Sequence, residues 1–276
     1  MPQDWLHRIL YALISGITEF LPVSTSAHQA LYRLLSGYDA AEPMLAFAVR
    51  LGSLFAVLMG CSGQIRHMMR QNRISQRSNR RRRYVDTGAM LDLRLLRTAS
   101  IPALISVFFY QQVGRWIQSP LWLALSLLLG GFLLFWPRVL PQGNKNGRSA
   151  SRLDGIVLGL GSTLAVIPGF SRIGCSYSFG LVQGMERSYA LEMSILLSVP
   201  VLLGLTALDL IALIAAKATI SGGIMLWALI CGAISFLGGY LSLTLIRHAC
   251  ARAPLSGYSY YAWGMALLIF VLYLTI

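Results

Sequence analysis

The sequence has 276 residues, of which 56% are hydrophobic and only 12% are charged. A soluble globular domain carries about 25% charged residues, so this composition excludes an ordinary soluble domain. The apolar residues form blocks of about 17–25 residues, the length that crosses the hydrocarbon layer of a membrane as a helix. The net charge of +13 therefore predicts basic cytoplasmic loops next to anionic membrane lipids, and no nucleic acid as a partner.

The apolar blocks alternate with basic stretches along the chain. In chain order they are a broken run (8–36), a span (44–62), a basic stretch (64–97), two spans (98–114 and 120–137), a second basic stretch (138–152), a second broken run (153–185) and three spans (190–214, 222–246 and 257–276). Pro22 and Pro168-Gly169 break the two runs, whose halves are too short to span. Irregular backbone at that depth is tolerated only where it lines a cavity, so both breaks are candidate site positions.

The arginines set the expected orientation of these blocks. With the basic loops 64–97 and 138–152 in the cytoplasm, the positive-inside rule holds and the two broken runs enter from opposite faces. Broken helices of inverted-topology repeats meet near the midplane in this way. We therefore predict an all-α integral membrane protein with six transmembrane helices plus two re-entrant helix pairs in inverted-topology repeats. Its single membrane domain, 1–276, contains repeat 1 over about 5–137 and repeat 2 over about 153–276.

The first break carries an acidic side chain, a histidine and hydroxyl groups. Glu19 lies in an apolar stretch, where an ionised carboxylate costs at least about 2–3 kcal/mol unless it is paired. It is either the structural partner of an arginine or an acid/base or metal-binding carboxylate. His28 is either a structural residue or a nucleophile or general acid near neutral pH. Ser24 and Thr25 precede it in the chain.

The second break is followed directly by Ser171 and Arg172. A guanidinium matches phosphate oxygens in a bidentate fork, and inside a membrane it needs an anionic partner. Gly174 and Ser176 are predicted to offer backbone N–H groups and a hydroxyl at a helix start, where anions bind. The alternative interpretation is that Arg172 only pairs with Glu19.

Arg50 lies inside the span 44–62. An intramembrane arginine needs a partner or an anion unless it extends to the membrane surface. We interpret it as a substrate-binding residue, with extension to the surface as the alternative. Asp209 is interpreted as a structural or helix-end group.

Four segments carry a family pattern. Residues 16–28 read GITEFLPVSTSAH and resemble the first signature of the undecaprenyl-diphosphate phosphatases of the BacA type. Residues 167–176 read IPGFSRIGCS and resemble their second signature, of the form PGxSRSxxT. Residues 50–57 and 203–210 also look like segments of this family, and the resemblance spans nearly the whole chain in order.

The resemblance implies a hydrolase that releases inorganic phosphate from a polyprenyl diphosphate. This reaction recycles the lipid carrier of peptidoglycan synthesis and cell wall biogenesis, and is the source of bacitracin resistance. The resemblance also implies a multi-pass protein of the bacterial cytoplasmic (inner) membrane, with its active site facing the outer side. A divalent cation, Mg²⁺ or Ca²⁺, assists in the family, and a homodimer is an open expectation.

Residue roles follow from the same resemblance. The catalytic residues it implies are Glu19, His28, Ser24, Thr25 and Arg172. The expected substrate-binding residues are Ser171, Arg172, Gly174, Ser176, Arg50 and Ser15. Glu19 is also the expected metal ligand.

The chain departs from the family pattern at five places, of which Thr25 for serine and Ser176 for threonine keep a hydroxyl. Ser15 stands where the family has the first carboxylate of its acidic pair, four residues before Glu19. Ile173 stands where the family has a serine, and Arg50 where it tends to have glutamine. The changes at 15 and 50 make the site about two charges more positive and weaken a Mg²⁺ site. We therefore predict that Arg50 neutralises part of the diphosphate charge and that dependence on divalent metal is reduced.

Two functions follow from these residues. The first is a polyprenyl-diphosphate phosphatase, in which His28 or a hydroxyl attacks the terminal phosphorus. The alternative is a non-catalytic or weakly catalytic paralogue that binds or translocates polyprenyl phosphate, which Ser15 and Ile173 favour. Sequence does not decide which group is the nucleophile.

Overall fold

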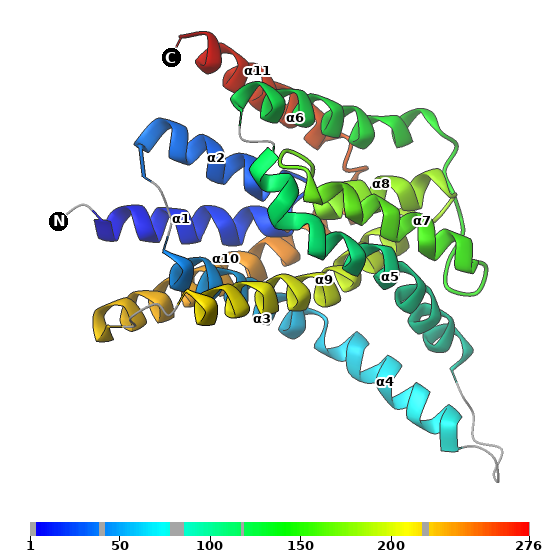
Figure 1. Ribbon diagram of the computed structural model, residues 1–276. Coiled ribbons are helices and arrows are strands. Elements are labelled where there is room, and N and C mark those ends of the chain that lie inside the picture. The colour runs from blue at the N-terminus through cyan, green and yellow to red at the C-terminus, as the bar shows by residue number, and fades with distance from the viewer. Residues whose placement is uncertain (1–3, 39–41, 78–85, 117–118, 217–220, 276) are drawn as a thin grey trace.

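The computed structural model describes residues 4–38, 42–77, 86–116, 119–216 and 221–275 (Figure 1). The α-helices are α1 (Asp4–Glu19), α2 (Thr25–Ser36), α3 (Pro43–Gly60), α4 (Ser62–Arg77), α5 (Thr87–Trp116), α6 (Pro120–Phe135), α7 (Arg152–Thr163), α8 (Arg172–Val182), α9 (Arg187–Ala215), α10 (Gly222–Arg252) and α11 (Gly257–Thr275). The 3₁₀ turns η1 (Trp136–Val139) and η2 (Leu164–Val166) follow α6 and α7. The described ranges contain no named strand, only an isolated bridge between Lys145 and Met185.

Six described helices are long and apolar enough to cross a membrane: α3, α5, α6, α9, α10 and α11. They coincide with the six predicted spans, so the expectation of an all-α, multi-pass membrane protein is confirmed. By contrast α1, α2, α7 and α8 contain 16, 12, 12 and 11 residues. At about 1.5 Å per residue, none of these four reaches across about 30 Å of hydrocarbon. Both predicted broken runs are therefore pairs of short helices.

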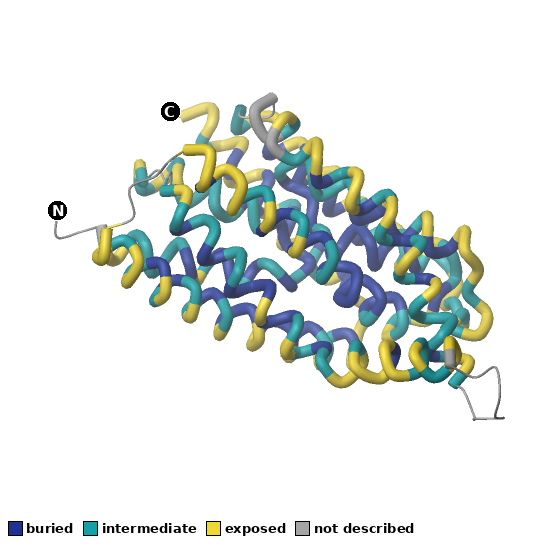
Figure 2. The backbone as a smooth tube through the Cα atoms, turned by 60° about the horizontal axis from the view of Figure 1, so that its bottom comes forward, coloured by how far each residue is buried: buried dark blue, intermediate teal, exposed yellow. Residues whose placement is uncertain are grey.

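The outer surface of the bundle is apolar. Phe108, Leu229 and Leu267 are 70%, 66% and 64% exposed, although each lies within a spanning helix. Figure 2 shows buried segments along the middle of the molecule and exposed residues on its outside. An apolar face of this extent is unusual for a soluble monomer and suits contact with lipid chains.

Glycines allow the spanning helices to approach one another closely. A Cβ atom on Gly52 of α3 would lie 2.2 Å from the carbonyl oxygen of Gly232 on α10. A Cβ atom on Gly16 of α1 would lie 2.5 Å from the carbonyl oxygen of Ser235, also on α10. Small residues at such contacts are typical of helix packing in membranes. As a result α10 is held against both α1 and α3.

The stretch 64–97, predicted as a loop, is helical at both ends. Residues up to Arg77 continue α4, and α5 already begins at Thr87. The reason is composition, because the stretch is rich in Arg, Gln, Met and Leu, which favour helix. In Figure 1, α4 projects from the bundle on the side opposite to the start of α1 and the end of α11. We call the side of α4 the basic end.

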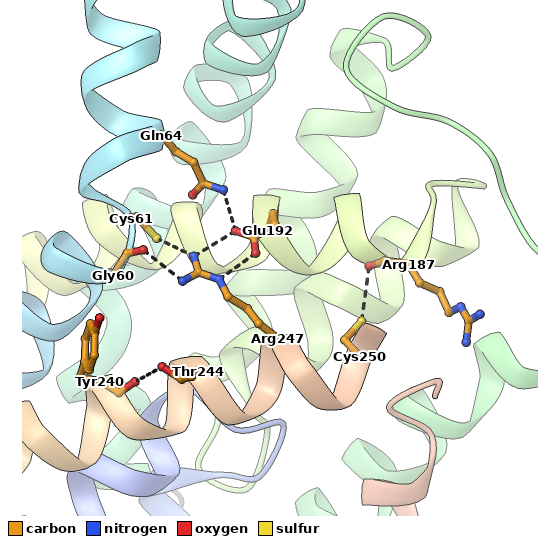
Figure 3. Close-up of polar contacts among 9 residues, drawn as sticks. All are labelled: Gly60, Cys61, Gln64, Arg187, Glu192, Tyr240, Thr244, Arg247 and Cys250. Carbon is orange, nitrogen blue, oxygen red and sulfur yellow. Dashed lines mark hydrogen bonds and ion pairs between the residues drawn. The ribbon is translucent and has the colours of Figure 1, made fainter. Parts of the chain in front are cut away.

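An arginine with four hydrogen bonds joins three helices at the basic end (Figure 3). Arg247 on α10 donates to both carboxylate oxygens of Glu192 on α9, at 2.7 and 3.0 Å. It also donates to the carbonyl oxygen of Gly60 at 3.0 Å and to the sulfur of Cys61 at 3.3 Å. This contact fixes the end of α3 against α9 and α10.

Candidate active site

Each break in the chain is followed by a helix with a serine cap. Ser24 precedes α2 and accepts a hydrogen bond from the backbone N–H of Ala27 at 3.3 Å. Ser171 precedes α8 and accepts one from the backbone N–H of Gly174 at 3.2 Å. Serine is a favoured residue at this position because its oxygen satisfies an otherwise unpaired N–H. Two of the predicted site hydroxyls therefore also begin the helices that follow the breaks.

The second break depends on a glycine in the left-handed backbone region. Gly169 has φ +108°, and a Cβ atom there would lie 2.6 Å from the Cβ atom of Ser126. Any side chain would be strained by the backbone and would also collide with α6. Gly169 thus turns the chain from η2 towards Ser171 while packed against α6.

The two breaks, far apart in sequence, touch each other. The backbone N–H of Gly169 donates to the hydroxyls of Ser24 and Ser26 at 3.2 and 3.3 Å. The hydroxyl of Ser171 donates to the carbonyl oxygen of Leu21 at 3.2 Å. The irregular backbone of each run is therefore hydrogen-bonded by the other, as burial away from water requires.

Glu19 and Arg172 form an ion pair across this contact. The Nη1 atom of Arg172 lies 2.7 Å from Oε1 of Glu19. Their side chains are only 13% and 14% exposed. The guanidinium of Arg172 makes no other hydrogen bond within the described part of the chain. A guanidinium carries five N–H donors, so this ion pair leaves Arg172 with donors for an anion.

A second arginine reaches the same region from α3. The Nη1 atom of Arg50 lies 2.7 Å from Oδ2 of Asp209 on α9. Its guanidinium lies 5.4 Å from the ring centre of Tyr110 on α5, a distance at which a cation and an aromatic face attract. Asp209, interpreted from sequence as structural, is thus the partner of Arg50.

These groups surround one cavity between the two breaks. Its lining residues are Tyr11, Ser15, Glu19, Val23, Thr25, Ser26, Gln29, Ala46, Val49, Arg50, Ser53, Tyr110, Ala165, Phe170, Ser171, Arg172 and Leu205. Six predicted site residues are among them: Ser15, Glu19, Thr25, Arg50, Ser171 and Arg172. The cavity combines two guanidinium groups, one carboxylate and several hydroxyls, which suits a phosphate-bearing ligand.

Ser24 and His28 lie on the side of the first break that faces Tyr261 of α11. Nε2 of His28 lies 2.5 Å from the hydroxyl of Tyr261 on α11, and Nδ1 lies 2.7 Å from the carbonyl oxygen of Ser24. His28 and Ser24 line a separate, smaller cavity with Tyr261. Within this structure, His28 therefore does not face the cavity that holds Glu19 and Arg172.

Gly174 and Ser176 also lie away from the main cavity. A Cβ atom on Gly174 would lie 3.1 Å from Leu134 on α6. Ser176 is 1% exposed, and its hydroxyl donates to the carbonyl oxygen of Leu158 on α7 at 3.0 Å. Both residues follow α8 into the bundle, so the structure brings only the start of this helix to the cavity.

The donor set fits a divalent cation poorly. Among the described residues, Glu19 is the only carboxylate that lines the cavity, and it is engaged by Arg172. Ser15 donates to the carbonyl oxygen of Tyr11 at 2.7 Å and accepts from Gln29 at 2.8 Å. The described residues contain no group of three or more His, Cys, Asp or Glu side chains that could hold a metal. A Mg²⁺ site normally uses one or two carboxylates with a nearly ideal octahedral set of oxygens.

Sequence reasoning missed several polar residues of the cavity, chiefly Tyr11, Gln29 and Tyr110. A periodic signal was present for two of them. Tyr11 lies one helical turn before Ser15, which lies one turn before Glu19, and Gln29 lies one turn after Thr25. Residues four apart share a helix face. Tyr110 is brought to the site only by the packing of α5, and no local pattern identifies it.

Comparisons with known proteins identify the family of this chain. The family described as bacitracin resistance protein BacA matches residues 8–268. The chain is 31% identical over 278 residues to an undecaprenyl-diphosphatase of Syntrophotalea carbinolica, covering 98% of this chain and 99% of the relative. It is 28% identical over 269 residues to undecaprenyl-diphosphatase 1 of Shouchella clausii, covering 96% and 95%. An undecaprenyl-diphosphatase of Moorella thermoacetica is 35% identical over 211 residues, covering 74% and 76%. The chain therefore belongs to the bacitracin resistance protein BacA family.

Proposed function

We propose that this protein is an undecaprenyl-diphosphatase, which hydrolyses a polyprenyl diphosphate to the monophosphate and inorganic phosphate. The observation that carries the proposal is the ion pair of Arg172 and Glu19 at the contact of two broken helices. An arginine with unused donors, next to hydroxyls in a partly closed cavity, suits a diphosphate better than a neutral ligand. The names of the relatives agree with this chemistry.

We further propose that the pairs α1–α2 and α7–α8 are re-entrant and belong to inverted-topology repeats. In that arrangement the protein lies in a bacterial inner membrane with the basic end on the cytoplasmic side. The cavity that holds Glu19 and Arg172 opens to the outer side. The support is the positive-inside rule applied to the arginine-rich stretches, together with broken helix pairs at corresponding places in the two halves. Association into a homodimer stays a prediction.

In the proposed reaction, Arg172 binds oxygens of the terminal phosphate and exchanges part of its contact with Glu19 for them. Arg50 neutralises further charge on the diphosphate. The hydroxyl of Thr25 attacks the terminal phosphorus and gives its proton to Glu19, and the bond from phosphorus to the bridging oxygen breaks. The polyprenyl monophosphate leaves, and water then releases inorganic phosphate from Thr25. Stabilisation of charge should be the largest contribution to this phosphoryl transfer.

Thr25 is preferred over His28 as the nucleophile because only Thr25 lines the cavity with Arg172. No step is assigned to a metal ion, since the donor set fits one poorly. We propose instead that activity depends little on divalent cations.

The test is phosphate release from undecaprenyl diphosphate by purified protein. Thr25→Ala should abolish turnover, whereas Thr25→Ser, which keeps a hydroxyl, should retain most of it. A trapped phosphoenzyme that survives acid would support Thr25, because phosphohistidine is destroyed by acid. Full turnover by Thr25→Ala would refute the proposed nucleophile. Tight binding of the lipid without any turnover would instead favour a carrier of polyprenyl phosphate.

A further inference from the structure

A second, larger cavity lies at the basic end, away from the candidate active site. It has a volume of about 430 Å³. Its walls come from the end of α6 with η1 and the segment 140–143, the second half of α8, the start of α9, the end of α10 and the link between α10 and α11. From Arg187 at the start of α9 to Leu205 in the active-site cavity, the helix rises about 27 Å. The two cavities are therefore distinct.

Positive charge gathers at this second cavity. Arg138 from η1 and Arg187 from α9 both line it. Arg187 forms no ion pair with any described residue, and Figure 3 shows its side chain pointing away from Glu192 and Arg247. Arg138 donates to the hydroxyl of Tyr260 at 3.2 Å, which leaves most of its donors unused.

The start of α9 adds backbone donors to the same cavity. Glu186, Arg187 and Ser188 line it and form the N-terminus of this 29-residue helix. The cap residue Glu186 makes no side-chain hydrogen bond to the helix N–H groups. A helix start with free N–H groups and two neighbouring arginines favours an anion. Glu186 is the single acidic side chain among the described residues that line this cavity, and it opposes an anion there.

A buried tyrosine gives a separate indication of a polar ligand. Tyr177 on α8 lines the cavity and is only 1% exposed. Its hydroxyl is buried without a well-formed hydrogen bond, and its polar neighbours are the thiol of Cys250 and the backbone of Leu255. An unpaired buried hydroxyl costs about 1–3 kcal/mol, a cost that a ligand oxygen would remove.

Apolar side chains form part of the remaining walls, together with polar ones such as Gln142 and Ser256. Leu134, Pro137, Leu181 and Pro254 line the cavity beside the polar groups. A free anion would gain nothing from this surface, whereas the glycerol and first methylenes of a phospholipid would be buried against it. The mixed lining thus matches a lipid headgroup at the membrane interface.

From these observations we infer that the second cavity binds the phosphate group of an anionic phospholipid. Arg138, Arg187 and the start of α9 hold the phosphate oxygens, and the hydroxyl of Tyr177 donates to the headgroup. The inference does not depend on the proposed phosphatase activity. Because Tyr177 and Arg172 both belong to α8, such a lipid would also hold the inner half of the helix that begins at the active site.

The test is native mass spectrometry of the full chain, delipidated in detergent and titrated with phosphatidylglycerol or phosphatidylcholine. The wild-type protein should bind phosphatidylglycerol at least about 10-fold more tightly than phosphatidylcholine, as expected for charge-assisted hydrogen bonds. The double variant Arg138→Gln/Arg187→Gln should lose this preference. The control Arg94→Gln/Arg97→Gln removes the same charge from exposed positions on α5 and should keep it. Equal preference in the two double variants would overturn the inference.

Two further measurements separate the sources of the phosphate group and the role of Tyr177. Inorganic phosphate alone should not raise the unfolding temperature of the delipidated protein. A rise as large as that given by phosphatidylglycerol, abolished in the double variant, would overturn the lipid assignment in favour of a free-phosphate site.

Tyr177→Phe keeps the fold-stabilising ring and should weaken lipid binding by about 5-fold, the worth of one hydrogen bond. Unchanged binding by this variant would remove Tyr177 from the site.

Discussion

Two partly buried arginines, Arg172 and Arg247, each pair with a glutamate, yet they use their hydrogen-bond donors differently. Arg172 makes one hydrogen bond among the described residues, at 2.7 Å to Glu19, and lines a cavity. Arg247 makes four, to Glu192, Gly60 and Cys61 (Figure 3). Neither residue type nor an acidic partner therefore identifies an anion site. The unused donors next to open space distinguish Arg172 as a ligand-binding group from Arg247 as a structural one.

The largest expected effect is at Arg172. Arg172→Ala should lower the rate of phosphate release by about 10³-fold, because it removes a charge that stabilises the transition state. Arg172→Lys keeps the charge but not the bidentate fork, and should recover only part of the rate. Steady-state kinetics on purified protein measure both. A loss below 10-fold in the alanine variant would contradict the contrast with Arg247.

Arg247→Gln should act on stability and leave the chemistry intact. The variant leaves Glu192 without its main partner, and the side chains of the pair are 28% and 26% exposed. We expect a loss of about 2 kcal/mol, between the values for exposed and buried ion pairs. Thermal unfolding in detergent reports the loss, and phosphate release per folded molecule should change less than 3-fold. A rate as low as that of Arg172→Ala would show that both arginines serve the reaction.

Asp154 provides a smaller effect at the basic end. Burial alone would raise the pKa of its carboxyl, but hydrogen bonds from Ser151 and Lys145 outweigh burial, so the pKa is lowered. The resulting stability is fully present above the unfolded pKa of about 3.9 and is lost as pH falls through the lower folded pKa. Asp154→Asn should therefore cost about 1 kcal/mol at neutral pH and nothing in strong acid. Unfolding curves of the wild-type protein and of Asp154→Asn, from neutral pH to strong acid, check that their free energies of unfolding become equal at low pH.

The smallest expected effect is that of metal removal. EDTA should reduce phosphate release less than 2-fold, because Arg50 supplies positive charge and Glu19 is the only carboxylate among the described residues that line the cavity. Ser15→Glu restores a second carboxylate and should make the variant sensitive to EDTA. Strong inhibition of the unchanged protein by EDTA, reversed by Mg²⁺, would refute this prediction.

Most of the membrane architecture was predictable, because spans are read from the length of apolar blocks. The breaks were predictable for the same reason, since Pro22 and Pro168-Gly169 interrupt those blocks. The helical ends of the stretch 64–97 were not predicted, because arginine is common in polar loops and is also a good helix former.

The sequence alone determined the class of protein, the six spans, the two breaks and the residue types that suit a phosphate. Only the tertiary structure decided which of those residues share a cavity. Glu19 and Arg172 meet because the two breaks hydrogen-bond to each other, while His28, three residues beyond Thr25, faces Tyr261 instead. Local patterns fix which helix a side chain belongs to, but the direction it faces depends on helices distant in sequence that pack around it.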